Sequence, residues 1–188
     1  GKADKVIVDG DYAYAISSEE DLKVIDIATS EVIALATAEG AEDYDAKDIA
    51  ISGKHAYVAM DEYGIISFDI TDPENPLQSG ELNVAGSGIR DIETYNKDRI
   101  FFVEYLSSGD VYNIVYIDSA DTNSMAELWS YSLTEGSAIN SLCADGNRLF
   151  VTNEDGVDVI MSPLDDVYTV EVGCELKITV YAEDPDDD

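Results

Sequence analysis

Basic residues are scarce in this chain of 188 residues. Lys and Arg number 10 against 41 Asp and Glu, which gives a formal net charge of −31 at pH 7. Such a negative field repels phosphate backbones and anionic lipid headgroups, so nucleic acids and membrane surfaces are disfavoured as partners, whereas cations and basic partners are favoured. The same carboxylates also keep a protein soluble in saline surroundings, and composition does not separate these two uses.

Histidine, cysteine and long apolar runs are also scarce. His55 is the single histidine, which removes most routes to a His-based metal site. Cys143 and Cys174 lie 31 residues apart, a spacing that fits one disulfide or two inert thiols but no zinc finger. No apolar run approaches the roughly 20 residues of a membrane span, so no membrane insertion is expected. No secretory signal opens the chain, and because Gly1 opens it instead of Met, we expect targeting segments to have been removed.

What the chain does have is an internal repeat. A phrase of alternating apolar residues, a turn and a closing aromatic occurs four times, at 6–14, 49–57, 92–101 and 142–150. The closing aromatics are separated by 43, 44 and 49 residues, which is near the period of four-stranded propeller blades. No helical apolar period persists for three turns, so the pattern predicts an all-β protein.

Each repeat contains four short β-prone runs separated by turn residues. We therefore predict a β-propeller of four four-stranded blades within residues 1–168, with an extra strand and an acidic tail at 170–188. The predicted blades span about 5–40, 48–83, 91–133 and 140–172. Because a blade must stack on its neighbours, four blades form either a closed four-blade ring or an arc of a larger or dimeric ring.

Residues 48–59 and 64–76 carry a resemblance to a known family. Their sequences, DIAISGKHAYVA and GIISFDITDPENP, resemble the LVIVD-repeat β-propellers of bacteria and archaea. The naming motif returns as KVIDI at 23–27 and VYID at 115–118, whereas repeat four has Met161 where the Asp should fall. Propellers of this family usually belong to secreted or surface proteins, so the resemblance implies an extracellular or cell-surface location.

The end of the chain carries a second, shorter resemblance. Residues 170–188 are similar to the opening strands of cadherin-like and related immunoglobulin-like surface modules, and either begin such a module or join the propeller. Asp184, Asp186 and Asp188 resemble the acidic triplets that share Ca²⁺ at junctions between these modules. A disulfide between Cys143 and Cys174 is a further prediction, and it would fit an oxidising compartment.

One position of the first strand offers candidate site residues. It reads Lys5, Asp48, Asp91 and Ser141 in the four repeats, and it would point at the mouth of a central channel. Asp48 and Asp91 are therefore candidate cation ligands, with Ca²⁺ as the ion that oxygen-rich sites suit. The alternative is that both carboxylates accept hydrogen bonds from backbone amides where the strands begin.

A second repeated position predicts structure and not chemistry. Asp26, Asp69 and Asp118 each precede a turn at the same place in their repeats, where a short carboxylate commonly binds backbone N–H groups. His55 has no Ser or Cys nucleophile near it, so no catalytic triad is indicated. The sequence therefore predicts a protein that is not an enzyme.

These observations together predict a non-catalytic binding or adhesion module. Its acidic propeller face would bind a protein or glycan ligand at the cell surface, and self-association is a further option. No cofactor is required apart from the candidate Ca²⁺, and no nucleic acid is expected. Two alternatives stay open: a Ca²⁺-dependent propeller hydrolase that activates water, and a structural repeat of a cell-envelope layer.

Overall fold

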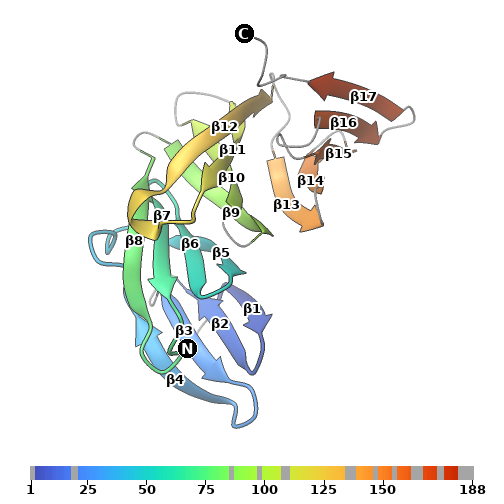
Figure 1. Ribbon diagram of the computed structural model, residues 1–188. Coiled ribbons are helices and arrows are strands. Elements are labelled where there is room, and N and C mark those ends of the chain that lie inside the picture. The colour runs from blue at the N-terminus through green and yellow to red at the C-terminus, as the bar shows by residue number, and fades with distance from the viewer. Residues whose placement is uncertain are drawn as a thin grey trace.

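The structure is a computed structural model that describes residues 3–17, 21–84, 87–96, 99–106, 111–133, 139–145, 148–153, 156–161, 167–172 and 176–181. Apart from one turn of 3-10 helix, the regular elements in these residues are β-strands. They form four antiparallel sheets that follow one another along an arc (Figure 1). The predicted all-β propeller of four blades is confirmed.

Within each sheet the strands are adjacent in chain order. The first blade contains β1 (Lys5–Asp9), β2 (Tyr12–Ile16), β3 (Leu22–Asp26) and β4 (Glu31–Ala36). The second contains β5 (Ala46–Ser52), β6 (His55–Met60), β7 (Gly64–Asp69) and β8 (Leu77–Asn83). The third contains β9 (Ser87–Asn96), β10 (Arg99–Leu106), β11 (Tyr112–Asp118), η1 (Thr122–Ser124) and β12 (Ala126–Leu133). The fourth contains β13 (Ile139–Asp145), β14 (Arg148–Asn153), β15 (Gly156–Met161), β16 (Val167–Val172) and β17 (Leu176–Tyr181).

The fifth strand of the last sheet is the extra strand expected in 170–188. β17 pairs antiparallel with β16, so it extends the fourth blade of the propeller. Its resemblance to a cadherin-like module stays a prediction. Cys174 and the three aspartates at 184, 186 and 188 lie outside the described residues. Among the residues that are described, no helix has both the length and the apolar composition needed to cross a membrane.

The aspartates that end the third strands close turns, as predicted. The carboxylates of Asp26, Asp69 and Asp118 accept hydrogen bonds from the backbone N–H groups of residues 29, 71 and 120, at 2.8, 2.8 and 2.9 Å. Such donors favour the ionised carboxylate. The N–H of Thr29 lowers the pKa of Asp26, and the hydroxyl of Thr71, together with its N–H, lowers the pKa of Asp69. The repeated Asp therefore fixes the connection between the third and fourth strands.

The core of the protein lies in three joints between successive blades. Each joint is a cluster of buried apolar side chains drawn from two neighbouring sheets. The closing aromatics of the first three repeats lie in these joints: Tyr14 in the first, Tyr57 in the second and Phe101 in the third. In the third joint Phe101 stacks on Tyr116 with 4.5 Å between ring centroids. The repeat is thus a sequence signature of packing against the following blade.

The second and third blades also touch through backbone at their outer edges. At Gly80, in β8, an added Cβ would overlap the backbone carbonyl of Thr122 in η1. The hydroxyl of Thr122 donates a hydrogen bond to the carbonyl of Ser79 at 3.1 Å, which fixes the same approach. Only glycine allows the two backbones to come this close.

We predict that Gly80→Ala destabilises the protein by about 1–3 kcal/mol, because the methyl group must push η1 away from β8. Chemical denaturation followed by tyrosine fluorescence measures the change. Leu77→Ala is the matched control, since Leu77 lies on the same strand but is exposed, and it should change the stability by less than about 0.5 kcal/mol. Equal stability of Gly80→Ala and wild type would contradict the tight joint.

Candidate functional site

The predicted row of first-strand residues is brought together at the propeller axis. The inner strands β1, β5, β9 and β13 lie side by side in that order. Lys5 Nζ lies 2.8 Å from Asp48 Oδ1, the Asp48 and Asp91 carboxyl groups are hydrogen-bonded, and the Ser141 hydroxyl binds Asp91. We call Lys5, Asp48, Asp91 and Ser141 the axial row.

The two carboxylates of the axial row bridge neighbouring blades. Asp48 Oδ2 accepts a hydrogen bond from the N–H of Ile92 at 3.2 Å, and Asp91 Oδ2 accepts one from the N–H of Leu142 at 2.8 Å. Asp48 Oδ1 also accepts the N–H of Ile49 at 2.8 Å. Asp48 and Asp91 therefore accept hydrogen bonds from backbone amides, as the alternative interpretation predicted. Most of these amides belong to the next blade and not to the start of the same strand. Each carboxylate ties its own inner strand to the following one.

Burial changes the proton affinity of one of these carboxyl groups, that of Asp91. Asp48 and Asp91 are only 3% and 6% exposed. Burial, together with the hydrogen bond and charge of Asp48, raises the pKa of Asp91 to about 7, although the N–H of Leu142 opposes the shift. Burial acts to lower the pKa of Lys5, but the hydrogen bond to Asp48 and the negative charges of Asp48, Asp91 and Glu93 together outweigh it, so the pKa of Lys5 is raised. Asp91 therefore holds its proton more tightly than an ordinary aspartate, in a row that also contains the ammonium group of Lys5.

A third carboxylate near the row was not predicted as a site residue. Glu93 lies two residues after Asp91 on β9, and its Oε1 accepts a hydrogen bond from the N–H of Ala144 at 3.4 Å. Burial is the main cause that raises the pKa of Glu93, and the charge of Asp48 adds to it. Glu93 therefore makes a second link from β9 to β13. The repeat pattern did not indicate this link, because the equivalent residues in the other repeats are Ile7, Ala50 and Cys143 and none of them is acidic.

The donor set of the axial row suits hydrogen bonding better than metal ligation. Both oxygens of Asp48 already accept hydrogen bonds, and a cation at this point would compete with Lys5. Within the described part of the chain, no three His, Cys, Asp or Glu side chains converge in a way that could hold a metal ion. The Cys143 side chain is exposed on β13, and its pairing with Cys174 stays a prediction.

Loops of neighbouring blades meet around the mouth of the axis. Lys47 Nζ lies 3.3 Å from Asp45 Oδ2 and 3.2 Å from Asp61 Oδ2. Asp61 Oδ1 in turn accepts a hydrogen bond from the hydroxyl of Tyr105 at 2.8 Å, and the guanidinium of Arg90 lies 4.7 Å from the centroid of that ring. These contacts join the blade-linking segment, the β6–β7 loop and the end of β10.

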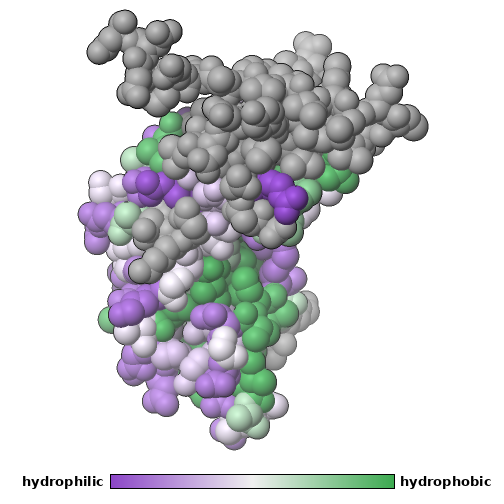
Figure 2. Space-filling view, turned by 45° about the vertical axis from the view of Figure 1, so that its right-hand side comes forward, coloured by the Kyte–Doolittle hydropathy of each residue, from purple (hydrophilic) through white to green (hydrophobic). Residues whose placement is uncertain are grey.

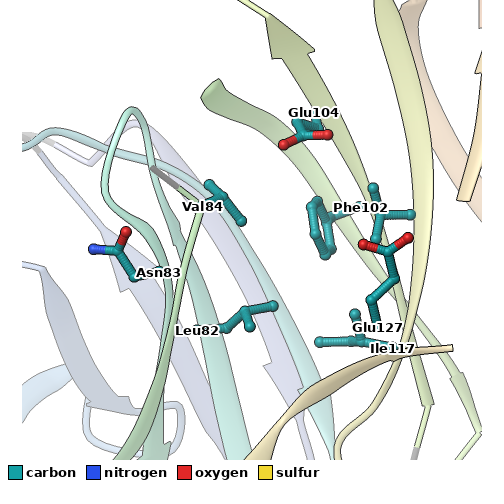
Figure 3. A pocket seen from close by; sticks show the side chains of 8 residues that line it. Leu82, Asn83, Val84, Phe102, Glu104, Ile117 and Glu127 are labelled. Atoms are coloured by element: carbon teal, nitrogen blue, oxygen red, sulfur yellow. The ribbon is translucent and has the colours of Figure 1, made fainter. Parts of the chain in front are cut away.

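A pocket of about 240 Å³ opens between the second and third blades (Figure 3). In Figure 3, Leu82 and Val84 point across the pocket toward Phe102 and Ile117, while Asn83 points away from it. Two glutamates complete the lining. The pocket residues are Leu82, Asn83, Val84, Phe102, Glu104, Val115, Ile117 and Glu127.

The two glutamates reach the pocket for different structural reasons. Glu104 Oε2 accepts a hydrogen bond from the side-chain amide of Asn113 at 3.0 Å, which orients its carboxylate. A β-bulge shifts the register between β11 and β12, so that Glu127 pairs with Ile117. In a strand without a bulge, side chains alternate between the two faces of the sheet, and Glu127 would lie on the opposite face from Ser130. The sequence alone therefore did not reveal this site.

Comparison with known proteins places the repeats and the fold. The sequence model of the LVIVD repeat matches residues 1–32 and 44–84. These matches contain β1 to β3 of the first blade, the start of β4 and all four strands of the second blade, and the third and fourth blades lie outside them. A search of curated proteins found no match. The resemblance expected from the second repeat is thus supported over two blades.

Solved structures share the fold at low sequence identity. The β-propeller domain of Cps50 (Swd1) from Myceliophteria thermophila is 12% identical with a TM-score of 0.64, over 95% of this chain and 60% of that one. U3-55K is 9% identical with a TM-score of 0.70, over 89% and 51%. The computationally designed Ika4 protein is 12% identical with a TM-score of 0.66, over 86% and 91%. The chain therefore spans 60% of the Cps50 propeller domain and about half of U3-55K.

We predict that the axial row makes stability depend on pH. An acid whose pKa is higher in the folded state than in the unfolded state stabilises the fold fully at pH values below its unfolded-state pKa. This stabilisation is lost as the pH rises through the folded-state pKa. For Asp91 the window runs from about pH 4 to about pH 7. Asn mimics the protonated acid, so the stability of Asp91→Asn relative to wild type should rise across this window.

Urea denaturation at a series of pH values measures this difference. Asp43→Asn is the control because it removes the same charge at an exposed position, and its curve should run parallel to that of wild type. Parallel curves for Asp91→Asn and wild type would contradict a raised pKa of Asp91.

Proposed function

We propose that the chain is a non-catalytic binding module that accepts a Lys or Arg side chain of a protein partner in the pocket between its second and third blades. The observation that carries this proposal is the composition of the pocket wall. Leu82, Val84 and Phe102 offer an apolar surface for an aliphatic stem, and Glu104 and Glu127 offer carboxylates for its charged end. Lys and Arg side chains have both parts.

The charge of the whole chain supports a basic partner. With a net charge of −31, the protein attracts positively charged surfaces over a distance set by ionic strength, which speeds encounter. Such steering weakens as salt shortens the Debye length to about 8 Å at physiological ionic strength. A basic segment would therefore be drawn to the molecule first and held at the pocket afterwards.

A binding role also agrees with the use of the axial carboxylates. Asp48 and Asp91 are the groups with the environment best suited to acid–base chemistry, yet their oxygens bond backbone amides of the next blade. Substitution of either would loosen the blades, which favours a structural role over a reaction. A surface or secreted location, which the resemblance to LVIVD-repeat propellers implies, is part of this proposal, since an adhesion partner would be met there.

A labelled oligolysine peptide is a suitable probe, and fluorescence anisotropy measures its binding. We predict that Glu127→Gln weakens binding about fivefold, the change expected for one partly exposed ion pair of roughly 1 kcal/mol. Glu74→Gln removes the same charge at an exposed turn far from the pocket and should leave affinity nearly unchanged. Equal losses in both variants would mean that the peptide senses only net charge, and would contradict a site in the pocket.

A further inference from the structure

The pocket between the second and third blades has a counterpart between the first and second, because the blades are repeats. Glu127 on β12 pairs with Ile117 beside a β-bulge, and Gln78 on β8 pairs with Phe68 beside a β-bulge at the same place in its blade. The repeat therefore aligns Gln78 with Glu127. The surroundings of Gln78 show what the equivalent space holds in the first joint.

In the first joint the chain itself places a turn in this space. Residues 37–45 link β4 to β5, whereas the shorter segment 84–86 links β8 to β9. In the longer linker the N–H of Ala41 donates a hydrogen bond to the carbonyl of Ala38 at 3.2 Å. Gly40 has a φ of 85° at the third position of this turn, as a type II β-turn requires. The longer linker thus adds a β-turn to the first joint.

The turn is held in the joint by packing and by hydrogen bonds. Ala41 is fully buried in the cluster that contains Met60, which occupies the repeat position of Glu104. The N–H of Glu39 donates a hydrogen bond to Gln78 Oε1 at 2.7 Å, and Gln78 Nε2 donates one to the carbonyl of Glu39 at 3.4 Å. A small side chain and a side-chain amide that both accepts and donates therefore fix the turn.

In the second joint the linker closes its turn directly, and the equivalent space is the pocket. The N–H of Ser87 donates a hydrogen bond to the carbonyl of Val84 at 3.1 Å. Glu127 lies across the pocket from Leu82 (Figure 3). The pocket of about 240 Å³ is thus the counterpart of the place that residues 38–41 take in the first joint.

We propose that the pocket takes a β-turn of the protein partner, in the place where the first joint holds its own turn. This inference rests on the proposed function and adds how the basic side chain is presented. A small side chain of the partner packs on the apolar wall, as Ala41 packs in the first joint. The Lys or Arg stands at the position of Glu39, where its N–H donates to Glu127 and its charged end lies among the pocket carboxylates.

The exchange of Gln for Glu explains why the turn of the partner is basic. Gln78 accepts from one backbone group and donates to another, so it suits a neutral peptide. An ionised carboxylate only accepts, so Glu127 has no donor for the carbonyl of a turn and needs N–H groups in its place. Glu104, oriented by Asn113, adds a second acceptor where the first joint has the apolar Met60. A neutral turn would leave both carboxylates unpaired beside an apolar wall, which is unfavourable.

A peptide that presents Ala-Lys-Gly-Ala in a head-to-tail cycle is the probe for the turn. Its control is a linear peptide with capped ends, the same composition and a scrambled order, so the two peptides carry the same charge. In fluorescence anisotropy the cyclic peptide should bind about fivefold more tightly, because its turn is formed before binding. Equal affinities would overturn the turn and leave the proposed function standing. No binding of either peptide or of oligolysine would contradict both.

Apolar side chains elsewhere on the surface offer a competing place for such a peptide. Figure 2 shows hydrophobic residues at the surface in the lower half of the molecule, where Figure 1 places the first blade, and Val8 on β1 is 63% exposed. Val8→Ser should leave the affinity for the cyclic peptide unchanged, whereas Val84→Ser, in the pocket wall, should weaken it about threefold. Circular dichroism checks that both variants are folded. The reverse order of effects would place the peptide outside the pocket and overturn the proposal.

A double-mutant cycle tests Glu127 as the residue that selects the charge of the turn. The second probe is the cyclic peptide with Gln in place of Lys. Wild type should prefer the Lys peptide about tenfold, the change expected for two partly exposed ion pairs. Glu127→Gln, which puts the side chain of Gln78 at this position, should remove most of that preference, whereas Glu74→Gln should keep it. The ratio of the two affinities does not respond to a general loss of stability, so an unchanged preference in Glu127→Gln would contradict the proposal.

Discussion

Each blade of this protein has two faces to bury, and a neighbouring blade covers them. The three joints show how the requirement is met, since apolar side chains from two sheets interdigitate and the closing aromatic of each repeat lies in the joint with the following blade. The hydrophobic effect acts between blades more than within them. Among the described residues, the second and third blades pack against a neighbouring blade on both sides, and the first and fourth blades pack against one.

Polar contacts then fix the register of one blade on the next. Asp48 and Asp91 bond the amides of the following inner strand, and at the outer edge Gly80 lets β8 approach the backbone of η1. These contacts are directional and the apolar joints are not. The inner and outer edges together determine how far each blade is rotated against its neighbour, and this rotation sets the curvature of the arc and the width of the pocket between the second and third blades.

Features that repeat along the chain could be predicted from the amino-acid sequence, and features that occur once could not. The aromatic at Tyr14 and Tyr57, the turn aspartates and the axial row recur at fixed positions, and this recurrence was enough to predict the four blades and their inner strands. The pocket gave no such signal, because Glu127 faces it only through a β-bulge in β12. The sequence also did not reveal that backbone amides of the following blade donate hydrogen bonds to Asp48 and Asp91, and the interpretation of these residues as cation ligands stays a prediction. The spacing of a repeat shows which residues occupy equivalent positions, but it does not show which groups each of them contacts.

Hydrogen exchange resolved by strand tests most directly whether stacking between blades stabilises this fold. In dilute, low-salt solution, where the chains repel each other, the account predicts the slowest exchange in β6 and β7, whose side chains are buried on both faces. It predicts faster exchange in β1 and β4, whose side chains are largely exposed. Equal protection of β1, β4, β6 and β7 under these conditions would contradict the account, because each blade would then be stable without its neighbours.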